Sequence, residues 1–173
     1  MNPGEFSSPG VSWEVEVRWK EGLVDPRVRD LEHQIESFLN PRLPEPWRTS
    51  VEVSDLYFFR GEGLSRETLE KVGCSLLADP VIQEFQVRAL GESAAAGPAC
   101  LHCATVLKKP GVMDPVEASL GQALGDLGLQ KLSVRTGARY AFLAAGPQSR
   151  RLGPPERKLL AEKVLSNPAI EAV

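Results

Sequence analysis

Cys100-Leu-His-Cys103 is the segment of this chain with the clearest capacity for chemistry. Two cysteines at this spacing can hold a metal ion or form a redox-active dithiol. A structural zinc site needs a second pair of ligands, and the sequence supplies none. We therefore interpret Cys103 as a buried small hydrophobic residue of a strand and Cys100 as a thiol at the end of a linker, and we expect no metal ligands.

The remaining polar groups are better explained by structure than by catalysis. His33 and His102 lie in different halves of the chain, and no serine elbow or zinc-binding helix motif accompanies them. Asp25 and Asp114 each precede a proline, as an N-cap precedes the first helical turn. Gly61-Glu-Gly63 is too short for a phosphate-binding loop. We expect no catalytic and no cofactor-binding residues in this chain.

Composition is that of an ordinary globular protein, with 173 residues, 42% hydrophobic and 25% charged. No stretch approaches the roughly 20 apolar residues of a membrane span, and no secretory signal is recognisable. The net charge of −3 disfavours nucleic acid as a partner. With three cysteines and no signal, we expect a cytoplasmic protein without membrane or nucleic-acid partners.

Charge is distributed unevenly along the chain. Residues 1–90 carry 10 Lys+Arg against 16 Asp+Glu, and residues 91–173 carry 10 against 7. The net charges are therefore −6 and +3. This difference either attracts the two parts to each other or reflects different partners, and unselected drift on solvated faces explains it equally well.

Hydrophobic periodicity predicts the elements that position these residues. Ser12–Trp19 alternates strictly, as a half-buried strand does, and apolar residues then recur at helical spacing over 27–39. A strand over 51–60, a helix capped by Ser65 and a strand over 81–90 complete a β-α-β-α-β order.

The second half repeats this order. Strand 131–144 is either continuous or broken at Thr136-Gly137, and the last strand is expected to be truncated relative to its counterpart. The expected elements are strands over 101–107 and 131–144, a helix capped by Asp114, a helix opened by Pro154, and a strand from Ala169 to Val173.

The chain is therefore a tandem duplication. Lys20–Pro26 returns as Lys109–Pro115, offset by 89 positions, and Leu77–Ile82 returns as Leu165–Ile170, offset by 88. The sequence predicts an α+β fold of two β-α-β-α-β repeats with ferredoxin-like character, pairing about a pseudo-twofold axis. The pattern does not decide whether the middle strand is a hairpin, which would give each repeat the order β-α-β-β-α-β. The predicted divisions are a disordered leader or tag over 1–10, repeat 1 over 11–90, a linker over 91–100 and repeat 2 over 101–173.

The ordered set of motifs resembles the PurS component of phosphoribosylformylglycinamidine (FGAM) synthase, present here twice. The second repeat carries it as Leu107–Pro115, Val134-Arg-Thr-Gly-Ala-Arg-Tyr140 and Leu165–Ile170. The first carries Trp19–Pro26 and Leu77–Phe85. The motif residues for which we expect structural roles are Gly22, Asp25, Pro26, Asp79, Pro80, Gly111, Asp114, Pro115, Gly137, Asn167 and Pro168.

The resemblance implies a non-catalytic scaffold, as a subunit or N-terminal domain of FGAM synthase in purine biosynthesis. Such a unit bridges the synthetase and glutaminase components and supports the transfer of ammonia between them. It implies no cofactor in this chain, since ATP and glutamine are used by the partner components. The whole enzyme is a glutamine-dependent C–N ligase.

Three residues of the second repeat are the candidates for the partner interface: Arg135, Arg139 and Tyr140. The two arginines are charged residues in a predicted strand beside a glycine, and neither capping nor a core role explains them. The matching stretch of the first repeat, Val53–Tyr57, lacks both positive charges, so the repeats are not expected to be interchangeable. A solvated strand face is the competing interpretation.

An alternative function is a regulatory module that binds a small metabolite at the seam between the repeats. RNA binding on an open sheet is disfavoured, because Trp13 and Trp19 alternate with Glu14 and Glu16, whose charge repels phosphate.

Overall fold

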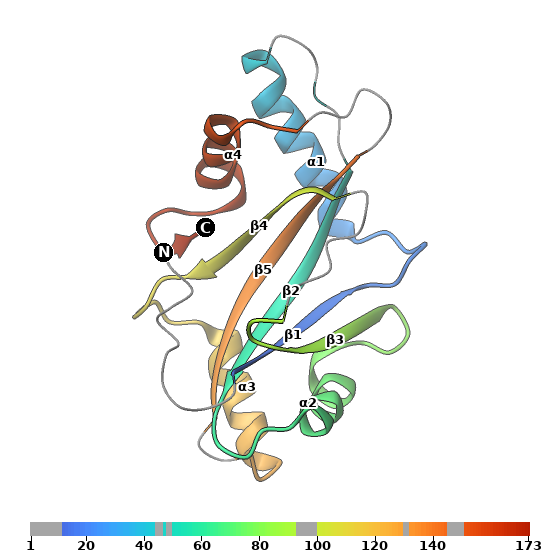
Figure 1. The fold of residues 1–173 in the computed structure, drawn as a ribbon, viewed down its shortest axis with the longest axis vertical. Coiled ribbons are helices and arrows are strands. Elements are labelled where there is room, and N and C mark those ends of the chain that lie inside the picture. Colours follow the sequence, from blue (N-terminus) through green and yellow to red (C-terminus); the bar gives the residue numbers. More distant parts are fainter. Residues whose placement is uncertain (1–11, 44–46, 48–49, 93–99, 130–131, 145–150) are drawn as a thin grey trace. The chain divides into compact units, whose positions relative to one another are not determined.

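The computed structural model describes residues 12–43, 47, 50–92, 100–129, 132–144 and 151–173. The predicted leader over 1–10, and the predicted linker over 91–100 except its ends, lie outside these residues. Within the described ranges the protein is α+β, with six strands in an antiparallel sheet and four α-helices (Figure 1). None of the helices in these ranges is long and apolar enough to cross a membrane.

The elements follow the predicted order in both halves, and each middle strand is a single strand without a hairpin. The first half contains β1 (Ser12–Trp19), α1 (Pro26–Leu39), a 3₁₀ turn (Asn40–Arg42), β2 (Ser50–Arg60), α2 (Arg66–Val72) with a π-helical turn (Gly73–Leu77), and β3 (Gln83–Ala89). The second contains β4 (Cys100–Lys108), α3 (Pro115–Asp126), β5 (Ser133–Leu143), α4 (Pro154–Leu160) with a π-helical turn (Ala161–Leu165), and β6 (Glu171–Ala172). Strand β5 is continuous through Thr136 and Gly137.

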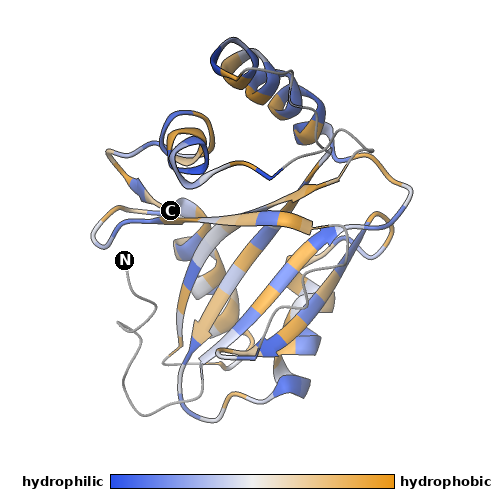
Figure 2. Cartoon of the chain, turned by 45° about the horizontal axis from the view of Figure 1, so that its top comes forward, coloured by the Kyte–Doolittle hydropathy of each residue, from blue (hydrophilic) through white to orange (hydrophobic). Residues whose placement is uncertain are grey.

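Strand order in the sheet is β3-β1-β2-β5-β4-β6. The third, first and second strands of the first repeat are followed by the second, first and third strands of the other, so the order is palindromic. Val15 of β1 lies opposite Tyr57 of β2 and Val87 of β3, in antiparallel register. Polar and apolar residues alternate along the strands, as Figure 2 shows, so each strand presents an apolar side.

Two compact units divide the chain, and their boundaries do not follow the repeats. Unit 1 consists of residues 1–23, 54–93 and 110–137, and unit 2 of residues 24–53, 94–109 and 138–173. Helix α3 of the second repeat thus belongs to unit 1, and helix α1 of the first repeat to unit 2. Each unit takes a helix from the repeat that does not supply its edge strands.

The core of unit 1 shows why α3 belongs there. Leu124 of α3 is 1% exposed and clusters with strand residues of the first repeat such as Val15 and Val17. Helix α2 contributes to the same cluster from the first repeat. The buried members of this cluster are Val15, Val17, Phe59, Leu69, Val72, Val87 and Leu124.

The core of unit 2 has the complementary composition. Ile35 and Leu39 of α1 are buried together with Phe142 of β5 and Leu160 of α4. Trp47, which follows α1, is fully buried in the same cluster. The buried members of this cluster are Ile35, Leu39, Trp47, Val51, Val53, Val106, Phe142, Leu152, Leu160 and Leu165.

The contribution of α3 to unit 1 gives a stability prediction. We expect Leu124→Ala to lower the free energy of unfolding by about 2–5 kcal/mol, because it removes a fully buried side chain and leaves a cavity. Leu127→Ala is the matched control, because Leu127 ends the same helix and is 56% exposed. Its effect should stay within about 0.5 kcal/mol. Urea unfolding measures both, and equally small losses would contradict the packing of α3 in this core.

Candidate functional site

The repeated motif residues make the same hydrogen bonds in both repeats. The backbone N–H of Lys20 donates to the Ile82 carbonyl at 3.0 Å, and that of Lys109 donates to the Ile170 carbonyl at 2.8 Å. The ammonium groups of the same lysines donate to the carbonyls of Pro80 and Pro168. Each lysine therefore anchors the segment that leads into the last strand of its repeat.

Asp79 and Asn167 form matching turns ahead of those strands. The side-chain Oδ1 of Asp79 accepts from the Val81 N–H at 2.8 Å, and that of Asn167 accepts from the Ala169 N–H at 3.1 Å. Their carbonyls accept from the backbone N–H groups of residues 83 and 171, at 2.7 and 2.8 Å. These are the local side-chain bonds that Asp and Asn make in turns, which explains the motif without a ligand.

Asp25 and Asp114 are buried N-caps, each followed by proline in the first turn. Asp25 Oδ1 accepts from the Arg27 N–H at 2.9 Å, and its carboxylate also pairs with the Arg27 guanidinium, 2.8 Å from Nη2 to Oδ2. Asp114 Oδ1 accepts from the Val116 N–H at 2.9 Å, and Oδ2 accepts from the Thr136 hydroxyl at 2.5 Å. The two caps therefore differ in their second partner, which is local for Asp25 and lies on β5 for Asp114.

The motif glycines have two different environments. Gly22 and Gly111 have φ angles of 84° and 83°, in the left-handed region that favours glycine, and each lies in the turn after the first strand of its repeat. Gly137 lies inside β5.

The predicted interface residues lie on β5 but differ in surroundings. Arg135 and Arg139 are both partly buried, and both engage in contacts within the chain. Tyr140 packs against the core cluster of unit 2. In a strand, residues 135 and 139 share one face, whereas residue 140 points to the other. The structure therefore separates Tyr140 from the two arginines.

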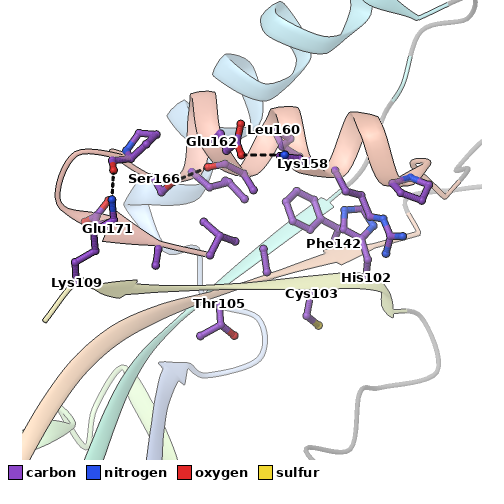
Figure 3. A pocket seen from close by; sticks show the side chains of 18 residues that line it. His102, Cys103, Thr105, Lys109, Phe142, Lys158, Leu160, Glu162, Ser166 and Glu171 are labelled. Atoms are coloured by element: carbon purple, nitrogen blue, oxygen red, sulfur yellow. Dashed lines mark hydrogen bonds and ion pairs between the residues drawn. The ribbon is translucent and has the colours of Figure 1, made fainter. Parts of the chain in front are cut away.

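A cavity of about 680 Å³ lies in unit 2, between β4 and the helix α4 with its π-helical turn. Figure 3 shows His102 and Phe142 on the side of β4 that faces α4, with Cys103 and Thr105 on the opposite side. On the α4 side, the cavity is lined by Pro154, Arg157, Ala161 and Leu165. Lys109 and residues 171–173 close one end.

An aromatic stack forms part of this cavity. The His102 ring lies on Phe142, with centroids 4.3 Å apart and an interplanar angle of 14°. Trp47 follows, 6.0 Å from Phe142 and 6.4 Å from His102. Neither ring nitrogen of His102 is exposed, and neither has a hydrogen-bond partner among the described residues. His102 is thus a buried polar group without the partner that such groups ordinarily have.

Burial is the main cause that lowers the pKa of His102 to about 4, and the positive charges of Arg157 and Arg151 lower it further. The imidazole is therefore neutral at pH 7, with one nitrogen that donates and one that accepts. A ligand in the cavity could satisfy either.

Cationic side chains dominate the cavity rim. Lys109 is held by the Pro168 carbonyl, and Lys158 lies 3.8 Å from Glu162. The guanidinium of Arg157 has no hydrogen bond or ion pair with any described residue, although the backbone N–H of Arg157 donates to the Gly153 carbonyl. Arg157 is therefore the rim charge that is available to a bound group.

Cys100 and Cys103 form no disulfide, and their Sγ atoms lie 3.1 Å apart. Within the described parts of the chain, no three His, Cys, Asp or Glu residues gather in a way that would hold a metal ion. Cys100 is partly exposed and Cys103 is exposed, so the prediction that Cys103 is a buried hydrophobic residue is wrong, because its side of β4 is not covered.

Of the interface and motif residues predicted from the sequence, only Pro168 lines this cavity. In the sequence, His102 is one residue of a predicted apolar strand, and Arg157 is one of several charged residues of a predicted surface helix. No protein-family model matches this chain, and no match was found among curated proteins. Function is therefore inferred from the residues and their geometry.

The second partner of Asp114 gives the first prediction for these sites. We expect Asp114→Ala to lower the free energy of unfolding by about 1–2 kcal/mol, because the α3 N-cap and the bond to Thr136 are both lost. Asp114→Asn should cost less, since its amide oxygen still caps the helix. Asp126→Ala, at the exposed end of α3, is the control and should be neutral within about 0.5 kcal/mol. A neutral Asp114→Ala in urea unfolding would contradict the structural role.

The pKa of His102 gives a second prediction, on the pH dependence of stability. Between pH 6.5 and about 4 the unfolded chain binds a proton at His102 that the folded chain does not, so stability falls as pH is lowered through this window. His102→Phe should make the fall shallower, because the ring stays but no longer titrates. His33→Gln is the control, since His33 is exposed. Urea unfolding at several pH values measures this, and equal slopes for wild type and His102→Phe would refute it.

Proposed function

We propose that this chain is a tandem PurS-like scaffold of FGAM synthase, which bridges the synthetase and glutaminase components in the cytoplasm. In this role the chain itself performs no ATP or glutamine chemistry. It holds the partner components together and supports ammonia transfer between them.

The observation that carries this proposal is the repeated cassette, which is ordered like the PurS motif set and makes matching hydrogen bonds in both repeats. The Lys20 and Lys109 anchors and the Asp79 and Asn167 turns are the clearest examples. The palindromic strand order also supports it, because two copies related by a pseudo-twofold axis would produce such an order.

The helices support a covalent pair over two independent modules. Each compact unit contains helices from both repeats. Leu124 of α3 clusters with strands of the first repeat, and Ile35 of α1 clusters with β4 and β5 of the second repeat as well as with β2 of its own. A duplicated chain of this kind has already used the surface through which single copies would associate. Its remaining surfaces are then free for different partners.

The proposed partner surface is the face of β5 that carries Arg135 and Arg139. Two guanidinium groups on one strand face favour an acidic partner surface. Because both arginines also contact other parts of this chain, their replacement requires a separate check of stability.

The proposal predicts that the full chain forms one complex with a cognate FGAM synthetase and glutaminase. We expect co-sedimentation of the three proteins, and Arg135→Glu with Arg139→Glu should weaken the complex and its resistance to salt. The melting temperature of the free chain separates lost contacts from lost folding. Arg18→Glu is the control reversal, because Arg18 is exposed on β1 and pairs with Glu84.

Absence of any complex with the wild-type chain would reject the scaffold function. An intact complex with the double reversal would instead reject only the arginine surface. Saturable binding of a small metabolite, with a rise in melting temperature, would favour the regulatory module. The cavity of unit 2 keeps that second candidate open, although it is lined by residues of repeat 2 rather than of both repeats.

A further inference from the structure

Two cysteine side chains meet at the start of β4. Cys100 is the first residue of this strand and Cys103 is the fourth, and their Sγ atoms lie 3.1 Å apart. Three residues of a regular strand advance about 10 Å, and side chains at this spacing point to opposite faces. The first residues of β4 therefore depart from regular strand geometry, and this departure brings the two sulfur atoms into contact.

Both thiols can be reached from solvent. Cys103 is exposed and Cys100 is partly exposed. Figure 3 shows Cys103 on the side of β4 that faces away from α4, so its exposure belongs to a face of the sheet rather than to the edge of the strand. A small reagent therefore reaches Cys103 first, while Cys100 lies in contact with the sulfur atom that reacts.

The pair is a feature of the second repeat alone. The offset of 89 positions matches Cys103 with Glu14, which pairs with Arg88 in the first repeat. The third cysteine of the chain, Cys74, belongs to unit 1 and is exposed on the π-helical turn that follows α2. Among the described residues Cys74 contacts no other cysteine, so it is an internal reference for an exposed single thiol.

The ligands around the pair favour sulfur chemistry over metal binding. A tetrahedral zinc site uses four ligands, and the two thiols supply half of them. Within the ranges that the structure describes, no third His, Cys, Asp or Glu side chain joins Cys100 and Cys103 in a possible metal site. Two accessible thiols in contact are, by contrast, sufficient for thiol–disulfide exchange.

We propose that Cys100 and Cys103 are a reversible oxidation site, which a low-molecular-weight disulfide converts to an intramolecular disulfide. The Cys103 thiolate attacks one sulfur of the small disulfide, forms a mixed disulfide and expels the first small thiolate. The Cys100 thiolate then attacks Cys103 Sγ and expels the second. The two cysteines lose two electrons and two protons, and the small disulfide is reduced to two thiols that carry those protons.

The position of the pair makes this oxidation reversible. The Sγ atoms are already in contact, so bond formation needs only a small shift of the side chains. Exposed disulfides are readily reduced, and disulfides of this kind are the labile and regulatory ones. Excess small thiol therefore returns the pair to the reduced form.

Equilibration of the reduced full-length chain with mixtures of reduced and oxidised glutathione tests the proposal. Remaining thiols are alkylated, and tryptic peptides are weighed by mass spectrometry. Residues 89–108 form one peptide with both cysteines, and Cys74 lies on residues 72–88. We expect peptide 89–108 to lose two hydrogens and retain no glutathione, with an oxidised fraction set by the square of the thiol concentration divided by the disulfide concentration. Cys74 should instead form a glutathione adduct that depends on the simple ratio.

Three variants separate proximity from the mere presence of two thiols. Cys100→Ser should accumulate at least about tenfold more glutathione adduct at Cys103 than wild type, because the second attack is lost. The exchange of Cys103→Thr with Thr105→Cys keeps the composition and moves one thiol along the strand, and it should lower the intramolecular disulfide at least about tenfold. Cys74→Ser should leave peptide 89–108 unchanged within about twofold. Circular dichroism verifies that each variant is folded.

The unfolded wild-type chain is a reference that needs no substitution. If the fold holds the two thiols in contact, the native chain should form the disulfide at least about tenfold more readily than the same chain in denaturing urea.

Three results would overturn the proposal. The first is a wild-type chain that carries glutathione on Cys100 or Cys103 without closing the intramolecular bond. The second is equal closure in the native chain and in either the urea-unfolded chain or the exchanged variant. The third is a covalent dimer in non-reducing electrophoresis in place of the intramolecular disulfide. None of these measurements involves the synthetase or the glutaminase, so this proposal and the scaffold function can fail separately.

Discussion

The structure depends on one packing constraint: the apolar sides of the strands in each unit are covered by helices from both repeats. Leu124 of α3 and Ile35 of α1 are buried in the cores of units 1 and 2, and each of these cores includes strand residues of the other repeat. A fully buried leucine or isoleucine contributes about 1.5–3 kcal/mol of hydrophobic stabilisation. Neither repeat can therefore leave the other without exposing core residues. For this reason we expect the two halves of the chain to fold together, although the sequence pattern predicts two modules.

Much of the secondary structure was predictable because short-range chemistry decides it. Strict alternation defines β1, Asp25 and Asp114 before proline define the starts of two helices, and Gly22 and Gly111 have the positive φ angles of tight turns. The exchange of α1 and α3 between repeats was not predictable. An amphipathic helix shows which of its sides is buried, but its sequence does not say which sheet covers that side.

The cavity of unit 2 could not be predicted from the sequence, again because tertiary packing decides which segments meet. The cavity is lined by β4, by α4 with its π-helical turn and by residues 171–173, segments that are separated in the sequence and meet only in the folded chain. His102 is buried beside Arg157 without a hydrogen-bond partner among the described residues. The two repeats thus have the same anchoring hydrogen bonds at Lys20 and Lys109, and they differ in the cavity that lies beside β4.

Direct contacts between methyl groups test the central claim, that each core is assembled from both repeats. A nuclear Overhauser spectrum of the full-length chain with labelled methyl groups supplies them. The account predicts cross-peaks that join Leu124 to Val15, Val17 or Val87 of the first repeat, and Ile35 to Val106, Leu160 or Leu165 of the second. Cross-peaks from Leu124 to Val106 or Leu160, with none to β1 or β3, would show that each repeat covers its own strands and would contradict the account.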